Sequence, residues 1–213
     1  MKEILGTNKG PAHLPLGQTS PYLEKFLNSS NEEINKFINE FHKEHDVSWS
    51  ISGDRENRVD LYQINENIIN EGRTIHLGID IIAPAGSALY SPFDSQVEHV
   101  EYDKGDGNYG WFIVLRTIIK DEPIYLLFGH LARDGLAAVG TQLVKGERFG
   151  FIGDTHENGN WFHHTHLQVL TQRGFDEGWV YKGLCTKEQL LTIDQFCPSP
   201  GKIFSQVNSS RPK

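Results

Sequence analysis

The spacing of apolar residues changes near residue 47 of the chain. Before that point, four apolar residues recur at helical spacing, which places them on one face of a helix. Ser30 and Glu33 precede them with the spacing of a capping box, in which two side chains satisfy backbone N–H groups at a helix start. We therefore predict a helix that packs on the rest of the protein, preceded over residues 1–20 by an extended arm. The four apolar residues are Ile34, Phe37, Ile38 and Phe41.

Beyond residue 47, short runs of β-branched and aromatic residues alternate with turn-forming residues. Residues 103–110 predict a loop and residues 120–123 a turn. Short strands separated by Gly and Pro predict a mostly β fold, with an antiparallel sheet or sandwich and flanking helices. In the tail, Thr186 and Gln189 have capping-box spacing and predict a helix over residues 187–196. The predicted strands cover residues 95–102, 111–119, 124–128 and 164–170.

Length and charge narrow the class of protein. With 213 residues, the chain is long enough for one core-bearing domain with extensions. We divide it into an N-terminal arm and helix (1–48), a main domain (49–175) and a C-terminal helix and tail (176–213). The formal net charge is −8 and the basic residues are not clustered, so nucleic acid is not expected as a partner. No apolar run approaches the roughly 20 residues of a membrane span.

The N-terminus and the cysteines bear on the cellular compartment. Residues 1–6 lack the apolar segment of a secretory signal. We expect a cytoplasmic protein as the sequence stands, or a periplasmic or secreted one if another route exports it. Cys185 and Cys197 are the only two cysteines. A disulfide between them stays open, but we favour two unpaired structural thiols.

The ten histidines form two groups. Five lie in polar or loop-like settings and are interpreted as ordinary surface residues. His164 and His166 lie two residues apart on a predicted strand, so their side chains project from one face, opposite to His163 and Thr165. Taken alone, this H-x-H pair also suits an exposed strand face. The five histidines interpreted as surface residues are His13, His42, His45, His99 and His156.

Two further motifs offer metal ligands or catalytic groups. His76 and Asp80 present an imidazole and a carboxylate four residues apart, and His130 ends a predicted apolar strand. A catalytic zinc takes three protein ligands and keeps a fourth position for water. His76, Asp80 and one histidine of the H-x-H pair would supply such a set. The other histidine and His130 would then serve proton transfer or oxyanion stabilisation.

In this order, the motifs resemble those of the lysostaphin-like zinc endopeptidases, the metallopeptidases of family M23, many of which cut peptidoglycan cross-bridges. The similarity covers residues 74–170, and the stretches around the motifs, residues 83–92, 139–147 and 149–153, also fit. The resemblance implies an antiparallel, barrel-sandwich-hybrid peptidase fold with a duplicated hybrid motif over residues 49–175.

The resemblance also implies roles for five residues. By this similarity, Zn²⁺ is bound by His76, Asp80 and His166. His164 and His130 act in catalysis, and the substrate is a peptide bond such as those in peptidoglycan cross-links.

The chain departs from the family pattern in two places. Residues 154–163 are bulkier than the Gly/Ser-rich loop that usually precedes H-x-H, and we expect them to border the cleft. Gln168 stands where Glu is commoner, on the same face as His166, and could contact that ligand. These departures, with the missing export signal, indicate an atypical branch and leave the scissile bond open.

Three alternatives stay open. A non-catalytic, peptidase-like module could bind glycan or protein, although degenerate members of the family generally lose ligands and none is lost here. A carrier of lipoyl or biotinyl groups would need an exposed lysine at a hairpin tip, and Lys145 lacks the usual flanking residues. The third alternative is a purely structural zinc site, but such sites usually have four protein ligands, often including Cys, and the two cysteines lie in the tail. The sequence leaves open the oligomeric state, and whether residues 1–48 pack beside the sheet, occlude the cleft or dimerise.

Overall fold

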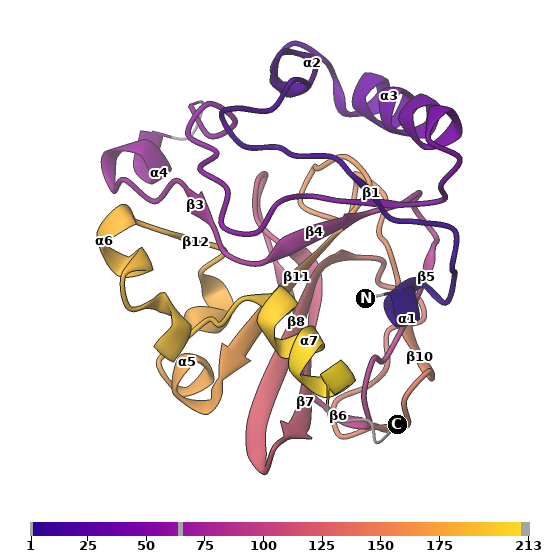
Figure 1. Cartoon of the computed structure of the whole chain (residues 1–213), viewed down its shortest axis with the longest axis vertical. Helices are drawn as coiled ribbons and strands as arrows, with labels where there is room; N and C mark the ends of the chain where they lie inside the picture. The colour runs from indigo at the N-terminus through magenta and orange to yellow at the C-terminus, as the bar shows by residue number, and fades with distance from the viewer. Residues whose placement is uncertain (1, 64–65, 210–213) are drawn as a thin grey trace.

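An eight-stranded sheet forms the centre of the computed structural model, which describes residues 2–63 and 66–209 (Figure 1). Apart from the parallel pair β1–β2, its strands pair antiparallel. The prediction of a mostly β fold with an antiparallel sheet and flanking helices is confirmed. In spatial order the strands are β1 (Ala12–His13), β2 (Ser50–Ile51), β4 (Ile79–Ile82), β11 (Thr165–Thr171), β8 (Glu122–Leu131), β7 (Gly110–Ile119), β6 (Ser95–Asp103) and β9 (Gln142–Leu143).

Two small antiparallel sheets accompany the large one. One joins β5 (Ala88–Tyr90) to β10 (Arg148–Phe151), and the other joins β3 (Ile75–His76) to β12 (Leu184–Cys185). The second of these attaches the C-terminal tail to the strand that carries His76.

The β7–β8 hairpin is longer and tighter than the sequence predicted. Lys120 and Asp121 both have positive φ, 53° and 65°, which is the backbone of a two-residue hairpin turn. Ile119 pairs with Glu122, so β8 begins within the predicted turn and continues past the predicted strand end at residue 128. The residues of this turn lack the usual Asn-Gly signal, and their conformation was therefore missed.

Both faces of the large sheet are buried. Alternate residues of β7 point to opposite sides: Ile113 and Leu115 join one apolar cluster, and Phe112 and Val114 join the other. The C-terminal segment supplies apolar side chains to both clusters. The first cluster receives Ile203 and Phe204 from α7 (Pro200–Ser209), and the second receives Trp179, Ile193 and Cys197.

The N-terminal segment packs on the sheet beyond β4 (Figure 1). It contains α1 (Lys2–Leu5), α2 (Leu23–Leu27) and α3 (Asn31–Glu44). The helix prediction is confirmed, because α3 begins at the Ser30–Glu33 capping box and buries its apolar stripe. The predicted extended arm is only partly extended: it contains α1 and β1, and it buries Leu14 and Leu16 in a cluster with α3.

The interpretation of His42 as a surface residue is wrong. His42 lies on the inner face of α3, is buried, and hydrogen-bonds through Nε2 with the Ser50 hydroxyl at 2.9 Å. Its neighbours in sequence are polar, so only the helical register could have placed it inward. The other four histidines of that group are exposed or half-buried.

The C-terminal tail folds as short pieces. The capping box of Thr186 and Gln189 is present, but the helix that it begins, α6 (Lys187–Leu190), ends well before the predicted residue 196. A 3-10 turn, η2 (Ile193–Gln195), follows, and it buries Ile193 in the core. Cys185 and Cys197 are buried free thiols, as favoured. The remaining short helices are α4 (Glu66–Asn70), α5 (Gln172–Asp176) and η1 (Trp179–Tyr181). None of the described helices has the length and apolar character needed to cross a membrane.

Candidate active site

Strand register gathers the predicted ligands at one place on the sheet. His166 on β11 pairs directly with Asp80 on β4 and, on its other side, with Gly129 on β8. Residues paired directly across neighbouring strands project to the same face, so His166 and Asp80 lie side by side. His76 reaches them from β3 through a close turn. At Gly78 in that turn, φ is +101° and an added Cβ would lie 2.3 Å from the Leu167 carbonyl oxygen, so only glycine fits.

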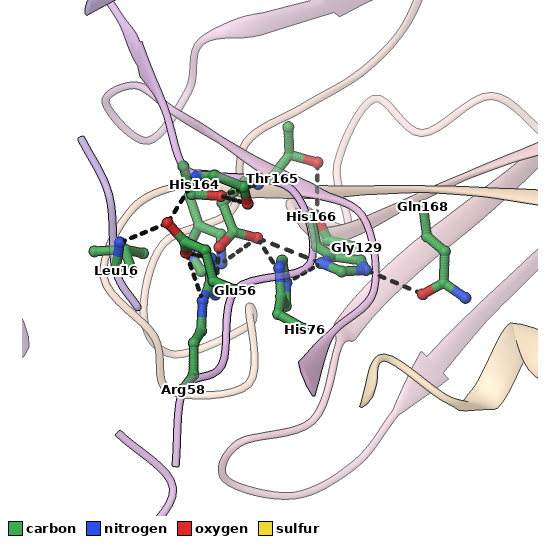
Figure 2. A network of polar contacts seen from close by, with 12 residues as sticks. Leu16, Glu56, Arg58, His76, Gly129, His164, Thr165, His166 and Gln168 are labelled. Atoms are coloured by element: carbon green, nitrogen blue, oxygen red, sulfur yellow. Dashed lines mark hydrogen bonds and ion pairs between the residues drawn. The ribbon is translucent and has the colours of Figure 1, made fainter. Parts of the chain in front are cut away.

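Three donor atoms converge in this arrangement (Figure 2). His76 Nε2 lies 2.8 Å from His166 Nδ1, and each of these nitrogens lies 3.3 Å from Asp80 Oδ1. Ligand atoms about 2.0–2.2 Å from a zinc ion at tetrahedral angles are roughly 3.3–3.6 Å apart. Two of the three separations match this spacing and the third is somewhat shorter. The residues therefore fit a small divalent cation.

The charge states of these side chains suit metal ligation. Burial alone would raise the pKa of Asp80, but the Arg58 guanidinium and the neighbouring histidines outweigh it and hold that pKa well below its ordinary value. Burial, with a contribution from Arg58, lowers the pKa of His76 to about 3. At neutral pH the site therefore presents an ionised carboxylate and a neutral imidazole, which are the forms that bind a metal.

A buried amide orients the His166 ring. His166 Nε2 lies 3.2 Å from Gln168 Oε1, which also accepts a hydrogen bond from the Tyr109 hydroxyl. The Gln168 Nε2 group donates to the Trp179 carbonyl in the C-terminal tail. Because an amide oxygen can only accept, the proton of His166 is on Nε2 and the lone pair of Nδ1 faces the other ligands. The expected contact between Gln168 and His166 is present.

His130 and His164 lie beside the three ligands. Their ring centroids are 4.4 Å apart, and His164 Nε2 lies 3.8 Å from Asp80 Oδ1. Each ring donates from Nδ1 to a carbonyl oxygen at 2.8 Å, His130 to Asn158 and His164 to Phe162. Nε2 of each neutral ring therefore keeps its lone pair and can accept a proton.

Burial dominates the electrostatics of these two histidines as well. It lowers the pKa of His164 to about 4 and holds the pKa of His130 well below its ordinary value. His130 also has φ of +62°, a left-handed backbone that is unusual for a residue other than glycine. Such backbone often marks a functional position, because the surrounding structure must hold it.

One detail of the strand prediction is wrong. β11 begins at Thr165, so His164 lies in the preceding segment rather than on the strand. The Thr165 hydroxyl donates to the Gly129 carbonyl, while His163 lies outside the site and contacts Asp154. The two histidines of H-x-H still reach Asp80, but His164 is oriented by its own hydrogen bond to the Phe162 carbonyl rather than by a strand.

A narrow pocket of about 130 Å³ opens over the ligands. Trp161 and Phe162 line it, so the prediction that the loop of residues 154–163 borders the cleft is confirmed. Tyr62 lines another wall, and its ring lies 6.4 Å from that of Trp161. The pocket is therefore lined by aromatic rings, with the imidazoles and Asp80 at its base.

Two charged residues of the site were missed from the sequence. Arg58 Nη1 forms an ion pair with Asp80 Oδ2 at 2.7 Å, and Glu56 pairs with Arg58 on the other side. Both precede the motif region and are separated from it by residues 64 and 65, outside the described structure. Two charged residues with one residue between them carry no specific signal, and only the tertiary fold brings them to Asp80.

The sequence of this region identifies its class. Residues 74–176 match the model described as "Peptidase family M23". The matched range contains all five residues of the candidate site, from His76 to His166. Residues 74–176 thus form a domain of the peptidase class. That domain belongs to peptidase family M23.

Solved structures resemble the chain over roughly half its length. A mutant catalytic domain of the prophage-encoded M23 protein EnpA from Enterococcus faecalis is 19% identical, with 54% of this chain and 77% of that chain covered at a TM-score of 0.40. LytU is 20% identical, and the match covers 57% of this chain and 74% of LytU with a TM-score of 0.40. The catalytic domain of the antimicrobial peptidase lysostaphin from Staphylococcus simulans is 18% identical. The match covers 56% of this chain and 80% of that domain, with a TM-score of 0.41. No curated protein matches the sequence.

Proposed function

We propose that this protein is a zinc-dependent metalloendopeptidase that hydrolyses a peptide bond in a peptidoglycan-like substrate. The observation that carries the proposal is the convergence of His76 Nε2, Asp80 Oδ1 and His166 Nδ1, with separations of 2.8–3.3 Å, beside two histidines that keep Nε2 lone pairs. Two imidazoles and one carboxylate are a known ligand set for hydrolytic zinc, with a fourth position left for water.

His76, Asp80 and His166 would hold the ion. A bound zinc supplies Lewis acidity, because it polarises a carbonyl and brings the pKa of water to about 7. The protein's part begins with the attacking water, whose proton His164 Nε2 accepts. The Nδ1–H group of His164 stays fixed on the Phe162 carbonyl, and Asp80 Oδ1, 3.8 Å from Nε2, stabilises the resulting imidazolium.

His130 lies on β8, next to the strand that carries His166. Its ring, 4.4 Å from that of His164, is held through Nδ1 by the Asn158 carbonyl. The proton that His164 takes from the water must be returned to the leaving amine. We assign His130 to this return and to the developing oxyanion, and in both roles its Nε2 must carry a proton at that stage of the reaction. A positioned acid or base of this kind contributes about 10²- to 10⁴-fold to the rate.

The pocket limits the substrate. A volume of about 130 Å³ between aromatic walls admits a slender peptide with small side chains more readily than bulky residues. Peptides rich in glycine or D-alanine, as in peptidoglycan cross-links, have this shape.

The test is hydrolysis by the zinc-replete protein. The substrates are purified peptidoglycan and a panel of glycine- and D-alanine-containing peptides. Each would be incubated with the parent, with His164→Ala and with the control His156→Ala, which changes an exposed histidine outside the site. We expect release of new amino groups by the parent and the control, and about 10²- to 10⁴-fold less by His164→Ala at equal zinc content. A parent that binds these substrates without cleaving them would instead indicate a binding module, and equal turnover by His164→Ala would refute the assignment of the general base.

A further inference from the structure

The two oxygens of Asp80 have separate partners. Oδ1 faces the imidazoles, 3.3 Å from both His76 Nε2 and His166 Nδ1. Oδ2 lies 2.7 Å from Nη1 of Arg58. The side chains of Asp80 and Arg58 are only 1% and 5% exposed, so water does not compete for this contact. One carboxylate oxygen is thus directed to the metal position and the other to a fixed cation.

Glu56 holds Arg58 in place. The Arg58 Nε group donates to Glu56 Oε2 at 3.1 Å, and Nη2 lies 3.0 Å from the same oxygen (Figure 2). Glu56 Oε1 accepts the backbone N–H groups of Leu16 at 3.0 Å and Gly53 at 2.8 Å. A Cβ on Gly53 would lie 2.6 Å from that oxygen, so a larger residue there would force the Glu56 carboxylate to shift. The N-terminal arm therefore reaches the site through one continuous set of polar contacts.

The backbone around Arg58 is fixed relative to His76. The Arg58 N–H group donates to the Thr74 carbonyl at 2.8 Å, and the His76 N–H group donates to the Glu56 carbonyl at 2.9 Å. These two hydrogen bonds fix the backbone of residues 56–58 beside β3. A buried ion pair of this kind contributes little net stability, since desolvation offsets most of the attraction. Its geometry therefore points to a role in the site rather than in folding.

We propose that Arg58, oriented by Glu56, is a positioning residue that keeps Asp80 a one-oxygen ligand of the metal. The inference rests on the proposed function. A carboxylate free to turn can offer both oxygens to the same ion and fill the position that a hydrolytic site keeps open for water. The ion pair with Arg58 Nη1 holds Oδ2, and Oδ1 is the oxygen that lies beside the two imidazoles. The proposal gives residues before the matched family region a role in the metal centre, because both Arg58 and its support from Leu16 lie there.

Cobalt substitution tests the proposal through a readout other than activity. Four-coordinate Co²⁺ absorbs visible light several-fold more strongly than five- or six-coordinate Co²⁺, so band intensity reports the number of ligands. The metal-free parent, Arg58→Met and Arg58→Lys would each be loaded to one equivalent. Arg173→Met is the matched control, because Arg173 forms a 2.7 Å ion pair with Glu177 on the surface.

We expect the intense four-coordinate band in the parent and in Arg173→Met, a several-fold weaker band in Arg58→Met, and recovery in Arg58→Lys, whose ammonium can still donate to Oδ2. With zinc at full occupancy, kcat of Arg58→Met should fall about 10- to 100-fold with little change in KM. An Arg58→Met protein that is folded and has the parent's band and kcat would overturn the proposal.

A second variant covers the case in which Arg58→Met does not fold. Glu56→Gln keeps the shape of the side chain and removes the charge that holds Arg58. The proposal requires a weaker cobalt band in this variant as well, and an unchanged band overturns it. A parent that binds neither Co²⁺ nor Zn²⁺ would refute the zinc assignment itself and the inference with it. If the parent shows the four-coordinate cobalt band and the variants show the same band, the role of Arg58 is refuted but the zinc assignment is not.

Discussion

The metal-free protein should lose stability as pH falls from 7.5 to 5.5, because it buries neutral histidines. Burial lowers the pKa of His76 to about 3 and that of His164 to about 4, and it also lowers the pKa of His130. In the unfolded chain these groups return to a pKa of about 6.5. Below that value the unfolded state binds more protons than the folded state, so the free energy of unfolding decreases until the pH reaches the folded pKa values.

The size of the loss in unfolding free energy depends on how far the pH falls below the ordinary histidine pKa. At pH 5.5, one unit below the ordinary histidine pKa, each buried histidine lowers the free energy of unfolding by about 1.4 kcal/mol. Three such groups give about 4 kcal/mol, a large share of the roughly 5–15 kcal/mol that stabilises a domain. Asp80 adds nothing in this window, because its carboxylate is ionised in both states above about pH 5. His42, whose pKa burial also lowers, acts in the same direction.

Urea unfolding in the presence of a chelator measures this loss, with the four tryptophans as the fluorescence signal. The parent, His164→Asn and the exposed control His156→Asn would be compared at pH 7.5 and 5.5. We expect the pH-dependent loss to be smaller by about 1.4 kcal/mol in His164→Asn and unchanged in the control. The reasoning would be refuted by a parent whose stability is the same at both pH values, or by His164→Asn losing as much as the parent.

Two further predictions concern the supports of the site and of the fold. Gln168→Leu removes the acceptor of His166 Nε2–H, so zinc affinity should fall about 10- to 100-fold in competition with a chromophoric chelator, and an unchanged Kd would contradict that role. Ser30→Ala removes the N-cap of α3 and should lower the free energy of urea unfolding by about 1 kcal/mol, whereas no change would show that the cap is dispensable.

Features that depend on neighbouring residues could be predicted from the sequence. Both capping boxes, at Ser30 and at Thr186, are present because each needs only two residues three positions apart. The central strands lie where β-branched and aromatic runs predicted them. The site residues could be predicted for another reason: three short motifs in a fixed order are specific even though each alone is weak, and the structure brings all five residues together. Their roles in ligation and catalysis stay predictions.

Features that depend on tertiary contacts could not be predicted. Arg58 and Glu56 lie in an irregular segment, and their partner Asp80 is on another strand. The burial of His42 depends on which face α3 turns to the core, and the early end of α6 depends on the burial of Ile193. In each case packing against distant residues outweighs the local pattern.

The position of zinc in crystals of the zinc-replete protein tests the central claim most directly, because anomalous scattering at the zinc edge locates the ion independently of any assumption about ligands. We predict one peak about 2.0–2.2 Å from His76 Nε2, Asp80 Oδ1 and His166 Nδ1. Nε2 of His130 and of His164 should not be bonded to it. A peak ligated by either of those two histidines, or a folded zinc-soaked protein with no peak at this place, would contradict the account.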